Sequence, residues 1–252
     1  MKDKKVALIT GGATGIGKEV ALLLASQGIN IAVNYSRSEK EAMETAKLIE
    51  AKGVSCLLQK ANVGNDQQVR VMIDNIVKQF GRLDYVVNSA GVTDFVNLAD
   101  LEGMKEEYWD KALSINVKGV FFVCRAAAPH LKQVKGSIVN ITSLSAFSGQ
   151  GSSIAYVTSK GAAIALTKSL SLALAPEVRV NNVAPGPVMT RWMAGREENI
   201  KKFGARTPLG RVCDPQDVAD VVVPILVSAG MMTGQTIVVD GGAVNGAILD
   251  PR

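Results

Sequence analysis

The chain has 252 residues, of which 47% are hydrophobic and 20% charged, so it is long and apolar enough to bury a core and is not a disordered chain. Its net charge of +5 would suit nucleic-acid binding, but Lys and Arg are interleaved with Asp and Glu, and only 5% of the residues are aromatic. We therefore expect a solvated basic surface and no nucleic-acid partner.

Cysteine and histidine usage excludes two further classes of protein. Cys56, Cys124 and Cys213 are far apart, odd in number and without metal-ligand spacing, and His130 is the single histidine. We expect no disulfide framework and no metal site. The first apolar run, Val6 to Thr10, is too short for a signal sequence or a membrane span, so the expected location is the cytoplasm, with no membrane partner.

Short apolar runs alternate with segments of helical periodicity along the whole chain. In chain order the expected elements are strand 6–10, a helix from Ile16 to Gly28, strand 29–34, helix 38–52, strand 54–59, a helix from Asn65 or Asp66 to Phe80, strand 83–88, one or two helices over 108–131, strand 136–142, helix 154–175, strand 178–184, a helix from Pro215 to Val227 and strand 236–239.

This alternation predicts an α/β fold in which a parallel, doubly wound sheet of seven strands carries helices on both faces. No linker interrupts the series, so residues 1–252 are predicted to form a single domain. Residues 188–211, which contain Trp192 and Pro208, are predicted to be a mobile segment. Such sheets bind ligands at the carboxyl ends of their strands, where the motifs described next are placed.

A glycine-rich turn follows the first strand and opens the first helix. It reads Gly11-Gly12-Ala13-Thr14-Gly15-Ile16-Gly17. Glycine allows sharp turning and close approach of the backbone to a pyrophosphate, and the N–H groups at a helix start favour an anion. The turn therefore predicts a dinucleotide site.

A second group of polar residues follows the strand at 136–142. Ser143 ends that strand, and Tyr156 and Lys160 are four residues apart in the next helix, so they share one face. A free phenol has a pKa of about 10, and a nearby cation favours its ionised form. The pair thus predicts a general acid or base at Tyr156 whose pKa Lys160 lowers.

The Gly-x-x-x-Gly-x-Gly turn, Asn88-Ser89-Ala90-Gly91, Asn116, the group Ser143, Tyr156 and Lys160, and Pro185-Gly186 come in one order. Together they resemble the short-chain dehydrogenase/reductase family over residues 4–242. The resemblance implies a Rossmann-type sheet of order 3-2-1-4-5-6-7. It also implies that Ser143 holds the substrate oxygen, Tyr156 exchanges its proton, Lys160 binds the nicotinamide ribose, and Asn116 supports a proton relay through water.

Cofactor choice depends on the residues that follow the second strand. No carboxylate comes before Glu39, whereas Arg37 offers a guanidinium and Ser36 and Ser38 offer hydroxyls to a 2′-phosphate. We expect NADP(H), with NAD(H) as the alternative, although the glycine turn carries Ala13 and Thr14 where relatives that prefer NADP often have a second basic residue. The full set of expected cofactor residues is Gly11, Thr14, Gly15, Ile16, Gly17, Tyr35, Ser36, Arg37, Asn62, Val63, Asn88, Ala90, Gly91, Tyr156, Lys160, Pro185, Gly186, Val188 and Thr190.

The substrate wall is expected from residues after Ser143, from 186–203 and from the tail 243–252. Candidate substrate residues are Ser143, Ser145, Gln150, Tyr156, Met189 and Trp192, with Phe147 and Met193 beside them. The resemblance is greatest to 3-oxoacyl-acyl-carrier-protein reductases, including Leu209-Gly210-Arg211. Leu172, however, stands where those reductases often have a basic residue for the acidic carrier protein, so a carrier-protein partner is doubtful.

The expected function is therefore NADP(H)-dependent reduction of a carbonyl to a secondary alcohol, or the reverse, on a 3-oxoacyl thioester or similar small molecule. A general ketone reductase or an alcohol or polyol dehydrogenase is the alternative. A dinucleotide-binding sensor without turnover is an alternative of another class, although such proteins tend to lose Tyr or Lys. Helices 108–131 and 154–175 match those that build the family's interfaces, which implies a homotetramer or homodimer.

Overall fold

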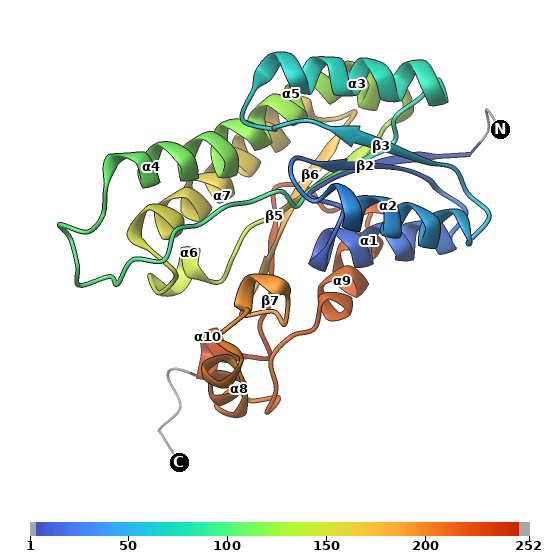
Figure 1. Cartoon of the computed structure of the whole chain (residues 1–252). Helices are drawn as coiled ribbons and strands as arrows, with labels where there is room; N and C mark the ends of the chain where they lie inside the picture. Colours follow the sequence, from blue (N-terminus) through green and yellow to red (C-terminus); the bar gives the residue numbers. More distant parts are fainter. Residues whose placement is uncertain (1–3, 247–252) are drawn as a thin grey trace.

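The computed structural model describes residues 4–246, in which seven strands form one parallel sheet of order β3-β2-β1-β4-β5-β6-β7. This arrangement confirms the predicted fold class and strand order (Figure 1). The strands are β1 (Val6–Thr10), β2 (Asn30–Tyr35), β3 (Cys56–Lys60), β4 (Tyr85–Asn88), β5 (Ser137–Ile141), β6 (Arg179–Pro185) and β7 (Thr236–Val239). Each observed strand lies within two residues of the expected range at both ends.

Helices connect the strands and cover both faces of the sheet. They are α1 (Gly15–Ser26), α2 (Glu39–Glu50), α3 (Asp66–Phe80), α4 (Glu106–Leu113), α5 (Val120–Val134), α7 (Ile154–Leu174) and α9 (Pro215–Val227). Further pieces, which the periodicity did not predict, are α6 (Ser145–Ser148), a 3₁₀ turn η2 (Arg191–Met193), α8 (Glu197–Ala205) and α10 (Ala243–Gly246). A π-helical segment, η1 (Ser114–Gly119), joins α4 to α5 within the expected helix 108–131.

The alternation of side chains along β1 explains the two-faced core. Ala7 and Ile9 pack into the cluster formed with α1 and α9, whereas Val6 and Leu8 pack into the cluster formed with α3, α5 and α7. All four side chains are fully buried. Figure 1 shows α1 and α2 on the side of the sheet opposite α3 and α5. Burial on both faces explains why the strand sequences are apolar throughout rather than alternating.

Hydrogen bonds hold the ends of β1 and β4 together where the glycine turn begins. The hydroxyl oxygen of Thr10, the last residue of β1, accepts hydrogen bonds from the backbone N–H groups of Ser89 and Ala90, each at 3.1 Å. The turn after β1 and the loop after β4 are therefore neighbours at the carboxyl edge of the sheet, as expected for a ligand site in this fold.

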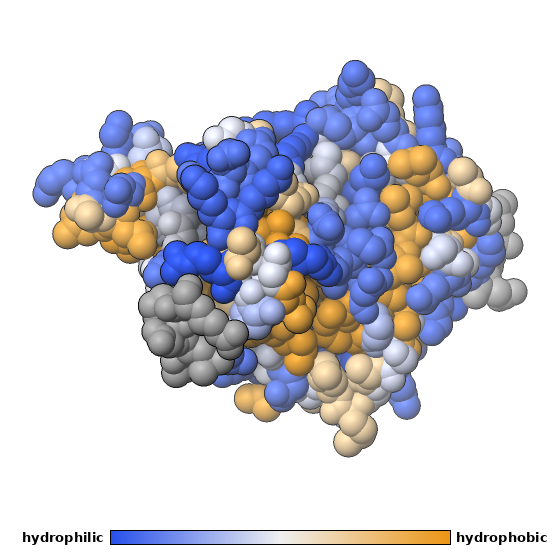
Figure 2. Space-filling view, turned by 90° about the horizontal axis from the view of Figure 1, so that it is seen from below, coloured by the Kyte–Doolittle hydropathy of each residue, from blue (hydrophilic) through white to orange (hydrophobic). Residues whose placement is uncertain are grey.

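The segment 188–211, expected to be mobile, contains η2 and α8 and lies with α10 at one end of the molecule (Figure 1). From that end, the surface presents hydrophilic residues with hydrophobic ones between them (Figure 2). Leu209 and Met231 are among the exposed hydrophobic side chains. Among residues 4–246, no helix has both the length and the apolar character needed to cross a membrane.

Candidate active site

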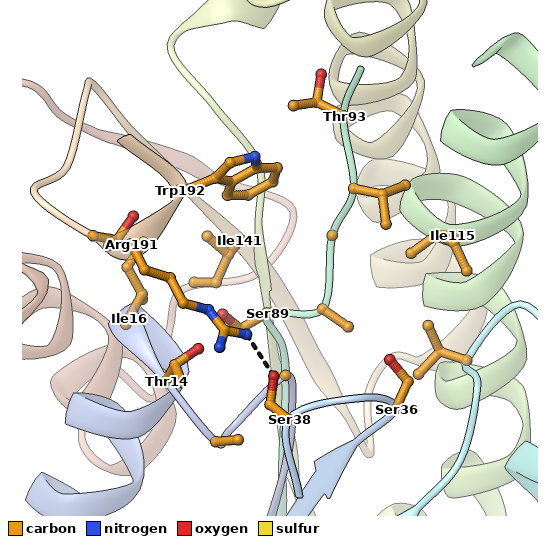
Figure 3. A pocket seen from close by; sticks show the side chains of 18 of the residues that line it. Thr14, Ile16, Ser36, Ser38, Ser89, Thr93, Ile115, Ile141, Arg191 and Trp192 are labelled. Carbon is orange, nitrogen blue, oxygen red and sulfur yellow. Dashed lines mark hydrogen bonds between the residues drawn. The ribbon is translucent and has the colours of Figure 1, made fainter. Parts of the chain in front are cut away.

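A cavity of about 510 Å³ lies at the carboxyl edge of the sheet and extends from the end of β2 to the start of α7. It brings together most of the residues expected to bind cofactor and substrate. Those that line it are Gly11, Thr14, Gly15, Ile16, Tyr35, Ser36, Arg37, Ser38, Asn62, Val63, Ala90, Gly91, Ser143, Tyr156, Lys160, Pro185, Gly186, Val188, Thr190, Trp192 and Met193. Residues between positions 11 and 193 of the sequence thus meet in one space (Figure 3).

The glycine turn forms one wall, and its geometry requires glycine. Gly11 has φ of +63°, and a Cβ atom there would lie 2.9 Å from the backbone of Ala90. Gly17 is buried beneath the turn, where a Cβ would lie 2.6 Å from the Gly11 carbonyl oxygen. Glycine at these positions lets the turn pack tightly against the loop after β4 and leaves its outer side open. This is the backbone cradle that a pyrophosphate needs at the start of α1.

Ser143, Tyr156 and Lys160 form the opposite end of the cavity. Ser153 caps α7 by accepting a hydrogen bond from the Tyr156 N–H at 3.2 Å, which fixes the first turn of the helix. The Lys160 ammonium lies one turn further, 5.6 Å from the centre of the Tyr156 ring. Ser143 comes directly after β5, and its hydroxyl is hydrogen-bonded to Tyr156. Ser145 holds Ser143 in place, because its N–H donates to the Ser143 Oγ at 3.1 Å.

Burial shifts the titration of both groups on α7. The pKa of Tyr156 is raised, because burial disfavours the phenolate more than the Ser143 hydrogen bond favours it. The pKa of Lys160 is lowered to about 8, also by burial. The sequence predicted that Lys160 lowers the pKa of Tyr156. The structure gives the opposite net direction, because desolvation dominates at Tyr156.

Lys160 is a buried ammonium with spare hydrogen-bonding capacity. It is 5% exposed, and it donates to the Ile141 carbonyl oxygen at 3.0 Å. Within residues 4–246 it forms no salt bridge with a carboxylate. A lysine ammonium has three donors, so Lys160 can bind further oxygen atoms in the cavity, such as ribose hydroxyls.

Asn116 lies behind the cavity wall, in the π-helical segment η1, and is buried. Its amide oxygen accepts from the Val92 N–H, and its amide nitrogen donates to the Val92 carbonyl, both at 2.9 Å. The same nitrogen donates to Ser159, whose hydroxyl donates to the Tyr156 carbonyl. The side chain of Asn116 therefore joins the loop after β4 to the first turns of α7. π-Helical turns are often found at functional sites.

The end of β2 forms the far wall, where the 2′-substituent of a dinucleotide would lie. Arg37 is exposed, and among the described residues its guanidinium has no hydrogen bond or salt bridge to another side chain. The side chain of Asn34 connects this wall to the end of β3, because its amide nitrogen donates to the carbonyl oxygens of Gln59 and Ala61. Asn62, after β3, is held by a hydrogen bond from the Gly64 N–H to its side-chain oxygen at 3.0 Å. The wall thus offers one free guanidinium and the hydroxyl groups of Ser36 and Ser38.

Some expected site residues do not line the cavity. Asn88 is buried, and its amide donates to Asn140 at 2.8 Å within the sheet. Gln150 is exposed, Met189 pairs through its backbone with Cys213, and Ser145 lies behind Ser143. Phe147 is exposed and also lies outside the cavity lining. Of the expected tail, residues 243–246 form α10, and 247–252 lie outside the described residues.

Other residues line the cavity although they were not among the expected site residues; they include Ser89, which lies inside the motif at 88–91, and Val92, Thr93, Lys111, Ile115, Ile141, Thr142 and Arg191. Most of them adjoin a motif residue in sequence, and that adjacency could have identified them. Arg191 directly follows Thr190, but its reach across the cavity depends on the conformation of η2, which the sequence pattern did not reveal. In residues 4–246, no group of three or more His, Cys, Asp and Glu side chains is placed to hold a metal ion.

Known proteins resemble the chain over nearly its full length. Residues 11–244 match the family model described as Enoyl-(Acyl carrier protein) reductase. The 3-oxoacyl-[acyl-carrier-protein] reductase FabG of Staphylococcus aureus (strain Mu50 / ATCC 700699) is 40% identical, with 96% of this chain and 99% of that protein covered.

Two solved structures are also similar. A short-chain type dehydrogenase/reductase from Mycobacterium marinum has a TM-score of 0.88 and 33% identity, with 95% of each chain covered. The acetoin dehydrogenase YohF from Salmonella typhimurium has a TM-score of 0.86 and 30% identity, with 98% of this chain and 99% of that chain covered.

Proposed function

Because the chain belongs to the short-chain dehydrogenase/reductase family of oxidoreductases, we propose that it interconverts a carbonyl and a secondary alcohol with NADP(H), using Tyr156 as the general acid and base. The observation that carries this proposal is the convergence of Ser143, Tyr156 and Lys160 on one end of a cavity whose other end carries Arg37. Family membership gives an enzyme acting on CH–OH or C=O groups.

The residues of the cavity fit a dinucleotide. The open backbone of the glycine turn suits the pyrophosphate, the free donors of Lys160 suit the nicotinamide ribose, and Arg37 suits a 2′-phosphate. Asn62 and Val63 would contact the adenine, while Pro185, Gly186, Val188 and Thr190 would lie along the nicotinamide half. NADP(H), when bound, supplies or accepts the hydride.

The chain's own residues then handle the oxygen and its proton. Ser143 donates a hydrogen bond to the carbonyl oxygen and holds it beside Tyr156. In reduction, the Tyr156 hydroxyl gives its proton to that oxygen as negative charge develops there. The positive charge of Lys160 stabilises the phenolate that remains. Asn116 is hydrogen-bonded to Val92 and, through Ser159, to the Tyr156 carbonyl, so it fixes the loop after β4 relative to α7. It also supports a water-linked return of the proton to Tyr156.

The substrate that we propose is a 3-oxoacyl thioester, since the relative from Staphylococcus aureus is named for that reaction. Small hydroxyketones and diketones are the second candidate. Leu172 favours them: its side chain is 82% exposed on α7 and supplies no positive charge to an acidic carrier protein. The similarity to the solved structure named acetoin dehydrogenase also supports this second candidate.

A substrate panel tests the proposed function. Purified protein would be mixed with NADPH and a series of β-keto esters, 3-oxoacyl thioesters, diketones and quinones while nicotinamide absorbance is followed. Oxidation of NADPH with at least one class is the expected result. Tight NADPH binding without oxidation across the panel would instead favour a sensor without turnover.

For the assembly we propose a homotetramer or homodimer in the cytoplasm, formed through the helices α4, α5 and α7. Phe121 on α5 and Leu172 on α7 are both exposed apolar side chains, which would be covered by a second copy. Light scattering coupled to size-exclusion chromatography gives the mass directly, and a monomer at micromolar concentration would contradict the proposal.

A further inference from the structure

Arg191 reaches across the mouth of the cavity to the wall at the end of β2. It belongs to η2, on the segment opposite that wall. Its guanidinium donates to the Glu41 carboxylate at 2.7 Å and to the hydroxyl of Ser38. Figure 3 shows the side chain extending from beside Trp192 toward Ser38, with this hydrogen bond drawn as a dashed line. A contact between residues 153 positions apart in the sequence therefore spans the cavity.

The place where Arg191 binds is where the proposed function puts the 2′-phosphate of NADP(H). Ser38 closes the stretch Ser36-Arg37-Ser38, which supplies the hydroxyls and guanidinium for that phosphate. Resting on that proposed function, we propose that Arg191 is a second basic residue for the 2′-phosphate, contributed from the opposite wall. It would supply the charge that is missing from the glycine turn, where Ala13 and Thr14 stand.

The partner of the Arg191 guanidinium in the structure is the Glu41 carboxylate. The pair is open to solvent, since the side chains of Arg191 and Glu41 are 56% and 41% exposed, and exposed pairs of this kind contribute little to stability. A phosphate carries more charge and can accept from both edges of a guanidinium. Replacement of the Glu41 carboxylate by a phosphate, as the partner of the Arg191 guanidinium, is therefore favourable. It leaves Glu41 solvated in the first turn of α2, where the helix dipole stabilises a negative charge.

The exchange has a consequence for the catalytic end of the cavity, because Trp192 follows Arg191. The Trp192 ring meets the Tyr156 ring edge to face, with 6.1 Å between the ring centres. The methyl group of Thr190, on the other side of Arg191, lies against Gly15 of the glycine turn. A phosphate that anchors Arg191 would thus fix its two neighbours against the catalytic tyrosine and the cofactor turn.

The pyrophosphate is the other phosphate of the cofactor, and it would lie nearer Gly15 and Thr190. NADPH and NADH share this pyrophosphate but differ in the 2′-phosphate. Comparing the two cofactors therefore distinguishes the two phosphates. The geometry favours the 2′-phosphate because Arg191 is bonded to Ser38 and Glu41, both at the start of α2.

The test is cofactor binding, measured by nicotinamide fluorescence without substrate. Arg191→Met, which keeps the apolar stem, should weaken NADPH binding about tenfold and NADH binding less than about twofold. Arg191→Lys should restore part of the loss, and Glu41→Gln should tighten NADPH binding because it removes the competing carboxylate. Arg196→Met is the matched control: Arg196 lies in the same segment but packs on Phe95, 3.5 Å from the ring centre, and should change neither affinity.

Equal weakening of NADPH and NADH binding by Arg191→Met, or no weakening of either, would overturn the assignment of Arg191 to the 2′-phosphate. The unaltered protein separates this outcome from failure of the proposed function. If it does not favour NADPH over NADH, the proposed cofactor itself is wrong. If it favours NADPH and Arg191→Met keeps that preference undiminished, only the role of Arg191 is wrong.

Discussion

The ammonium of Lys160 lies 5.6 Å from the centre of the Tyr156 ring, in an environment that buries the lysine almost completely. Burial lowers the pKa of Lys160 to about 8, so at neutral pH the group is still mostly charged. The fold thus keeps a positive charge beside a buried phenol where solvent does little to screen it. This arrangement costs stability, and in the proposed mechanism it stabilises the phenolate during proton transfer.

The first prediction concerns that cost. Lys160→Met should abolish turnover and yet raise the free energy of unfolding at pH 7 by about 1–3 kcal/mol, because a pKa depressed by burial records an unfavourable buried charge. The folded protein binds fewer protons than the unfolded chain above about pH 8, so the wild type should gain stability as pH rises past that value. The difference in the free energy of unfolding between Lys160→Met and the wild type should therefore become smaller above that pH.

Urea denaturation at several pH values between neutrality and the ordinary pKa of lysine measures this effect. Lys168→Met, on the same helix with its side chain exposed, is the control and should show no such pH-dependent difference. A Lys160→Met variant that is less stable than the wild type across the whole range would contradict the account of the buried charge.

The second prediction concerns cofactor choice. Arg37→Ala should raise the KM for NADPH about tenfold and leave the KM for NADH nearly unchanged, because only NADPH carries the 2′-phosphate that a guanidinium would bind. Lys40→Ala, on the exposed side of the first turn of α2 and outside the cavity lining, should affect neither. Equal effects of Arg37→Ala on both cofactors would refute the role of Arg37.

The third prediction concerns the glycine turn. Gly11→Ala should destabilise the protein by about 1–3 kcal/mol and greatly weaken binding of both cofactors, because alanine disfavours φ of +63° and its Cβ would clash with the Ala90 backbone. Gly230→Ala is the matched control, since a Cβ there meets nothing within 4 Å and its φ is not in the left-handed region. Calorimetry and NADPH titration of both variants give the answer, and unimpaired binding by Gly11→Ala would exclude the turn as the cofactor cradle.

Hydrophobic runs predicted the strands well because a doubly wound sheet is buried on both faces, as the split of Ala7 and Ile9 from Val6 and Leu8 shows. The π-helical segment at Asn116 could not be predicted in this way. Its hydrogen bonds to Val92 and Ser159 are tertiary contacts, and the apolar spacing of the flanking helices does not record them.

The candidate site was predictable where the sequence carries motifs and less so where it does not. The glycine turn, Ser143, Tyr156 and Lys160 meet in the cavity as expected. Arg191 was not among the expected residues, because its place in the cavity depends on a segment without strong periodicity. The direction of the Tyr156 pKa shift was also wrong, since spacing gives the neighbour at i+4 but not the depth of burial.

The central claim is that Tyr156 transfers the proton while the rest of the cavity holds the cofactor. Tyr156→Phe removes only the hydroxyl, so turnover of the best substrate in the panel should fall at least about a thousandfold, within the range by which general acid–base groups contribute. NADPH affinity, measured by nicotinamide fluorescence, should change less than about threefold. Retained turnover with unchanged NADPH binding would contradict the mechanism.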